Sequence, residues 1–155
     1  MTTTERKVAL AIELGRAMHD LKNHVRQVIQ DKLKACDTNI TFEMLEIMWM
    51  LWDRDGVNQQ EIADKTLRDK SSMTYLIDNL VKRGMVKRVE DKKDRRNKLI
   101  FLTGEAVKLK DQLCPWLTEV YTQATTDSKI DDLQASIEQL KRMISNLRQD
   151  NTSSH

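Results

Sequence analysis

The sequence is poor in the residues that interrupt helices or cross-link a chain. Its 155 residues include only 4 glycines, 1 proline and 2 cysteines. Because glycine and proline are the strongest helix breakers, most of the chain is free to form helix. Cys36 and Cys114 are too few for a disulfide framework, which fits a reducing compartment. The composition therefore predicts a mainly α-helical domain that is large enough to bury a core.

Long apolar runs and catalytic motifs are also missing. The sequence contains no run of about 18 apolar residues, so no transmembrane helix is predicted. The polar residues 1–7 lack the apolar segment of a secretory signal. We therefore predict a cytoplasmic protein with no membrane partner. There is no glycine-rich phosphate loop, nucleophile elbow or paired-carboxylate motif, so we predict neither an enzyme nor a cofactor. His19 and His24 stand five residues apart and do not share a helix face, so no metal site is predicted.

Apolar residues recur every three or four positions along most of the chain, which predicts amphipathic helices. Thr41 and Asp69 are good N-caps, and Asn58 and Glu61 have the spacing of a capping box. Gly84 can end a helix in the left-handed conformation. The predicted helices run from about 5 to 35, from 41 to the turn at 53–56, from 58 to 65, from 69 to 84, from 103 to 124 with a kink at Pro115, and from 128 onward.

Between residues 85 and 102 the apolar period changes to about two. The segments 85–89 and 98–102 are predicted strands, and the eight residues between them are all polar or charged. From Lys82 to Lys98 the chain carries 9 basic and 3 acidic residues, although its net charge is only +2. This local positive charge indicates a polyanionic partner. A solvated hairpin surface explains the same charge equally well, so charge alone does not decide.

Two short helices joined by a tight turn, with a basic hairpin directly after them, form a winged helix-turn-helix. The second helix of such a pair is narrow enough to enter the major groove of DNA. A protruding arginine of the hairpin tip suits the minor groove, and Asp94 can aim one through a charge-assisted bond. Asp78 on the helix would repel phosphate. The predicted DNA contacts are Lys70, Ser71, Ser72, Thr74, Tyr75, Lys82, Lys92, Lys93, Asp94, Arg95 and Arg96.

The segment 80–103 resembles the wing region of the MarR (multiple antibiotic resistance regulator) family. The matching residues are Leu80, Gly84, Val86, Arg88, Asp91, Asp94, Arg95, Arg96, Leu102 and Thr103. The resemblance departs at Lys92, where proline is frequent, and at Ala106, where glycine often occurs. It implies a dimer built from the first, fifth and sixth helices, a major-groove helix beginning at Asp69, and an Arg96 that enters the minor groove, positioned by Asp94.

A dimer is also predicted by the last helix, whose apolar residues repeat at alternating steps of three and four and form a seam that needs a partner. The first helix offers a matching stripe, so pairing within one chain is the alternative. The expected organisation is one domain over 1–150, with dimerisation helices at 5–38 and 103–150, a DNA-binding region at 41–102, and a disordered tail at 151–155. The seam consists of Ile130, Leu133, Ile137, Leu140, Ile144 and Leu147, and the stripe of Leu14, Met18, Leu21, Val25 and Val28.

An effector site is predicted around Met48, Trp49 and Trp52, since effectors of the resembled family occupy a cleft between the dimer helices and the winged domain. A small aromatic effector fits these residues, although aromatic side chains belong more often to a core. The function predicted is a sequence-specific regulator of transcription, a repressor that binds an inverted-repeat operator in double-stranded DNA as a homodimer. The alternatives are a non-specific DNA-binding protein and a dimeric adaptor for other proteins.

Overall fold

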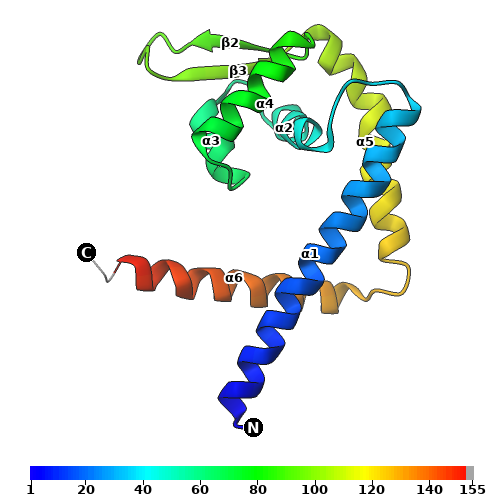
Figure 1. Cartoon of the computed structure of the whole chain (residues 1–155), viewed down its shortest axis with the longest axis vertical. Helices are drawn as coiled ribbons and strands as arrows, with labels where there is room; N and C mark the ends of the chain where they lie inside the picture. The colour runs from blue at the N-terminus through cyan, green and yellow to red at the C-terminus, as the bar shows by residue number, and fades with distance from the viewer. Residues whose placement is uncertain (153–155) are drawn as a thin grey trace. The chain divides into compact units, whose positions relative to one another are not determined.

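The computed structural model describes residues 1–152. Two compact units make up the chain, one from Met1 to Thr118 and one from Glu119 onward. The described residues form six helices and three strands, all of which except β1 are labelled in Figure 1: α1 Thr3–Ala35, α2 Phe42–Asp53, β1 Val57–Asn58, α3 Gln59–Lys65, α4 Lys70–Lys82, β2 Val86–Glu90, β3 Lys98–Leu102, α5 Gly104–Ala124 and α6 Ile130–Thr152. The predicted mainly α class with a winged helix-turn-helix is confirmed.

The buried core of the first unit is centred on α2. Half of the twelve residues of α2 are buried, as its apolar composition predicted. Each large apolar side chain buried there contributes about 1.5–3 kcal/mol to folding. The fully buried large side chains are Ile29 and Leu33 of α1, Leu45, Ile47, Met48 and Leu51 of α2, Ile62 of α3, Met73, Ile77 and Leu80 of α4, Ile100 of β3, and Leu113 of α5.

The helix starts follow the predicted caps with one correction. The Thr41 hydroxyl accepts a bond from the backbone N–H of Met44 at 3.2 Å, and thereby caps α2. The predicted capping box of Asn58 and Glu61 is wrong. Asn58 does cap α3, by accepting from the Gln60 N–H at 2.8 Å. The Glu61 carboxylate instead pairs with basic side chains, among them Lys65 at 3.3 Å, because an ion pair on its own helix is within reach.

The ends of α1, α3 and α4 share one backbone geometry. In each, the residue after the C-cap is left-handed and two N–H groups bond back to the last turn. Gly84 has φ +70° after α4, and the Met85 N–H reaches the Leu80 carbonyl at 2.9 Å, so the predicted stop at Gly84 is confirmed. Leu67 after α3 and Asp37 after α1 adopt φ +53° without being glycine. These stops fix the direction in which the chain leaves each helix.

The sheet is antiparallel and has the strand order β1-β3-β2. The predicted hairpin is present, with β2 beginning at Val86, one residue later than expected, and with Glu90 paired to Lys98 next to the connecting loop. Strand β1 was not predicted, because it has only two residues and forms by pairing with β3 far along the chain. The Asp55 carboxylate fixes this corner by accepting from the Leu102 N–H at 2.9 Å.

The stripe and the seam predicted to need partners are largely exposed. On α1, Val25 is buried whereas Met18, Leu21 and Val28 are exposed. On α6, which begins at Ile130 rather than at Ser128, Leu140 is half-buried and the other five seam residues are exposed. Helix α6 extends to Thr152, into the predicted tail, whose residues 153–155 lie outside the described residues. None of the helices described is long and apolar enough to cross a membrane.

The α2–β1 turn yields a test of backbone and packing strain. Gly56 has φ +67°, and a Cβ there would lie 2.7 Å from the Phe101 ring. We expect Gly56→Ala to lower the free energy of unfolding by about 2–3 kcal/mol, from left-handed strain and overpacking together. Gly84→Ala is the matched control, because it has the same backbone strain but meets only a Glu105 oxygen at 3.8 Å. Urea unfolding at one protein concentration should show a clearly smaller loss for Gly84→Ala, and equal losses would contradict the role of Phe101.

Candidate nucleic-acid interface

The outer face of α4 is polar and accessible over its first two turns. Lys70, Ser71, Ser72 and Tyr75 are exposed, and Tyr75 retains 67% of its accessible surface although it is aromatic. Opposite them, the apolar residues of α4 lie in the core, as predicted. Thr74 differs from the prediction. Its half-buried hydroxyl donates to the Lys70 carbonyl at 2.9 Å, so it serves α4 itself.

The beginning of α4 is capped by its own chain. The Asp69 carboxylate accepts from the Ser72 N–H at 2.7 Å. Hydrogen bonds from the Ser72 backbone and hydroxyl, and then from the Ser71 backbone, lower the pKa of Asp69 below its usual value. The carboxylate therefore stays ionised at neutral pH. It also occupies one of the free N–H groups at the start of α4, so fewer of these groups are available to a phosphate and the side chains of the first turn remain to make such contacts.

Arg88 of β2 links the hairpin to the helix-turn-helix. Its guanidinium forms an ion pair with Asp78 of α4, and its Nε donates to the Gln59 side-chain carbonyl of α3 at 3.2 Å. A further bond reaches the Thr74 carbonyl at 3.4 Å. Sequence reasoning treated Asp78 as an unfavourable charge on the DNA face. The structure shows it neutralised by Arg88, in a contact that joins α4 to the hairpin.

The hairpin tip has the predicted contact between Asp94 and Arg96. The Asp94 carboxylate accepts from the Arg96 backbone N–H at 3.1 Å and from its Nε at 3.3 Å. Arg96 nevertheless remains 92% exposed, so its guanidinium projects from the tip. Asp91 bends the loop by accepting from the Lys93 N–H at 2.9 Å. The remaining tip cations, Lys92, Lys93 and Arg95, are exposed beside it.

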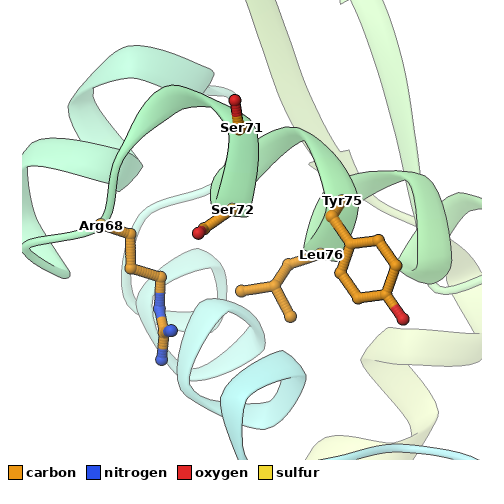
Figure 2. Close-up of a pocket in the computed structure, with 5 residues that line it drawn as sticks. All are labelled: Arg68, Ser71, Ser72, Tyr75 and Leu76. Carbon is orange, nitrogen blue, oxygen red and sulfur yellow. The ribbon is translucent and has the colours of Figure 1, made fainter.

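A cleft of about 420 Å³ lies beside the first half of α4. Figure 2 shows Ser72 and Leu76 projecting from α4 toward the side on which the Arg68 guanidinium lies. Arg68 was not predicted. It contacts Glu46 at 3.5 Å, and its buried Nε has no hydrogen-bond partner among the described residues. An arginine in the turn between the two helices was the signal in the sequence that could have identified it. The lining residues are Arg68, Ser71, Ser72, Tyr75 and Leu76.

A second cleft, of about 310 Å³, joins α3, α4 and the hairpin. It brings together Lys70 and Arg96, which are distant in sequence and were predicted separately. No motif in the sequence identifies its other lining residues, which are Asn58, Gln59, Gln60, Asn97 and Lys98. Lys82 is not part of this group. It lies at the far end of α4, about 18 Å along the helix from Lys70, in a different cleft with Arg83 and Glu105.

The residues predicted for an effector have packing roles in this chain. Met48 is fully buried, which corrects its assignment as an accessible ligand contact. Trp52 donates its indole N–H to the Ala106 carbonyl at 3.1 Å. Trp49 packs edge-on against Phe42, and its indole nitrogen is buried without a partner among the described residues. Of the two cysteines, Cys36 is exposed, whereas burial raises the pKa of the Cys114 thiol and so disfavours its reactive thiolate.

Two short helices joined by a tight turn and followed by a paired hairpin define a winged helix-turn-helix protein. Residues 40–98 match the family model of the MarR family. Over these residues the chain is similar to the MarR family, which confirms the resemblance predicted from the wing residues.

Known proteins of similar sequence are regulators of transcription by name. The HTH-type transcriptional regulator TtmR of Methylorubrum extorquens (strain PA1) is 29% identical over 92 residues, which are 58% of this chain and 47% of TtmR. The chain thus spans about half the length of TtmR. The HTH-type transcriptional regulator MhqR of Bacillus subtilis (strain 168) is 25% identical over 146 residues, which are 94% of this chain and 97% of MhqR.

The fold is also that of a solved DNA complex. A mutant of MarR from E. coli, complexed with operator DNA, has a TM-score of 0.73 to this chain at 21% sequence identity. The match covers 86% of this chain and 94% of that protein. At this identity the likeness establishes the fold.

The Arg88 network yields a test that needs no DNA. We expect Asp78→Asn to speed amide hydrogen exchange in the β2–β3 ladder about two- to fivefold, because a partly exposed ion pair is worth up to about 1 kcal/mol. Asp64→Asn is the control, since it removes the same charge from α3 at a side chain bonded only within that helix. Exchange measured by mass spectrometry should change for Asp78→Asn alone. Equal rates in the two variants would mean that the network does not hold the hairpin.

Proposed function

We propose that the chain is a sequence-specific regulator of transcription that binds double-stranded DNA. The observation that carries this proposal is the combination, within one domain similar to the MarR family, of an exposed polar face on α4 and an exposed cationic hairpin tip. Helix α4 would enter the major groove, where Ser71, Ser72 and Tyr75 meet base edges and phosphates. Arg96 would enter the adjacent minor groove. A regulator of this kind acts on DNA in the cytoplasm as a repressor.

The proposed regulator is a homodimer. In support, the seam of α6 is exposed, and the stripe of α1 is exposed except at Leu14 and Val25. Apolar surface repeated along a helix at three- and four-residue steps is stable in water only when another helix covers it. A second copy of the chain supplies such helices. A two-fold dimer presents two α4 helices to successive major grooves about 34 Å apart, so the operator would be an inverted repeat.

An effector that relieves repression belongs to the same proposal. Its support is the Trp49 indole N–H, because a buried donor without an acceptor is costly and a ligand oxygen would complete it. The ligand class is a small aromatic molecule with an acceptor group. We expect such ligands to quench the tryptophan fluorescence of the wild type and to lose most of this effect in Trp49→Phe. Quenching unchanged by that substitution would remove the proposed site.

The experiment that tests the function is selection of DNA from a random pool by the purified chain, together with its mass in solution. We expect a dimer that recovers a palindrome and prefers it over unrelated DNA by about a thousandfold or more. Enrichment without any shared sequence would favour the non-specific alternative. Absence of DNA binding in dilute buffer would favour the protein adaptor and end the proposal.

The selected operator then allows a test of Arg96. We expect Arg96→Ala to weaken binding and to reduce the slope of log K against log salt by about one unit. We expect Asp94→Ala to weaken binding too, although it removes a negative charge, because the Arg96 guanidinium is no longer held in position by the Asp94 carboxylate. Tighter binding by Asp94→Ala would indicate that charge repulsion, not the positioning of Arg96, governs the tip.

A further inference from the structure

The cleft between α3, α4 and the hairpin has the composition of an anion site. Its lining includes three cations, Lys70, Arg96 and Lys98, and no carboxylate. The other lining residues carry side-chain amides, whose N–H groups donate hydrogen bonds. Cations and amide donors that converge from three elements suit a phosphate oxygen, since each supplies a donor and the sum neutralises its charge.

The donors of the cleft differ in how far they are already engaged. The Lys70 ammonium has no hydrogen-bond or ion-pair partner among the described residues, and it is exposed on the first turn of α4. The Lys98 ammonium is paired with Glu90 at 2.9 Å, and the Gln60 side chain donates to Asp64 at 2.9 Å. Gln59 donates to the Thr74 hydroxyl at 3.3 Å and accepts from Arg88. Lys70 is therefore available at once, whereas Lys98 must exchange Glu90 for an incoming anion.

The position of the cleft identifies the anion. On the proposed function, α4 lies in the major groove and the hairpin tip in the neighbouring minor groove. One DNA strand separates two adjacent grooves, so its backbone must cross the protein between α4 and the hairpin. The cleft opens between those two elements, with Lys70 on one side and Lys98 on the other.

We propose that this cleft binds one backbone phosphodiester of the DNA strand that passes between the major-groove helix and the hairpin. Lys70 and Lys98 grip the phosphate from opposite sides, and the amides of Asn58 and Gln60 complete its shell. The contact carries no base information. It sets the depth and register of α4 in the groove, because the same strand is held between the two elements that read its grooves. This inference rests on the proposed function.

The test couples a single phosphate to the cleft. A set of selected operators, each with one neutral methylphosphonate, is bound by the wild type, by Lys70→Gln and by Lys98→Gln. In each half-site, we expect a methylphosphonate at one backbone position between the two grooves to lower the affinity of the wild type about tenfold. The same methylphosphonate should lower the affinity of each variant much less. Each variant should also lower the salt slope by about one unit. Lys108→Gln is the control, because it removes the same charge from an exposed residue of α5. This variant should lose as much affinity as the wild type when the methylphosphonate stands at the position between the two grooves.

Two outcomes overturn the proposal while DNA binding persists. The first is that the affinity loss from the methylphosphonate and the loss from Lys70→Gln multiply at every position of the operator. Independent losses of this kind would show that the cleft does not hold a strand phosphate. Inorganic phosphate is the second probe, with the side-chain amide NMR signals of Asn58 and Gln60 as the readout. Saturation by a few millimolar phosphate would identify a site for a free anion, whereas we expect these signals to shift with operator DNA only. Failure of the wild type to bind any DNA would instead refute the proposed function, and this inference with it.

Discussion

The guanidinium of Arg88 is the contact on which the geometry of the interface depends, because it joins three elements at once. From β2 it reaches Gln59 on α3 and Asp78 on α4. The apolar core beneath these elements holds them together but is weakly directional, since burial depends on area rather than on angle. Hydrogen bonds are directional. The core therefore makes the hairpin and α4 meet, and Arg88 determines how they are oriented.

Carboxylates around the basic surface shape it rather than oppose it. Asp78 orients Arg88, Asp94 orients Arg96, and Asp69 secures the first turn of α4. Glu90 holds Lys98 in an ion pair, which the proposed DNA phosphate would replace. A surface of cations alone would repel itself and leave each side chain mobile. Pairing lowers the net positive charge but gives each cation a defined position. Cations in defined positions can make specific contacts with DNA, whereas mobile cations only attract it.

The fold was predictable from the sequence wherever local rules determine structure. Thr41, Asp69 and Gly84 mark helix ends through bonds within a few residues, and the hairpin follows from its period of two. Strand β1 escaped prediction because it exists only through pairing with a strand some forty residues further along the chain. The grouping of Lys70 with Lys98 has the same origin. Met48 was misassigned because an apolar pattern does not distinguish a core from a pocket.

The left-handed Leu67 has a consequence for how such a domain changes over time. Its side chain is 94% exposed at φ +53°, so the turn between α3 and α4 is shaped by backbone hydrogen bonds, not by side-chain packing. Compared with glycine, leucine is strained at this left-handed position but has less conformational freedom to lose on folding, and the two effects partly offset one another. The angle between the two helices is thus set without packing contacts from the exposed Leu67 side chain. Surface chemistry at this corner can diverge among descendants while the docking angle is inherited unchanged.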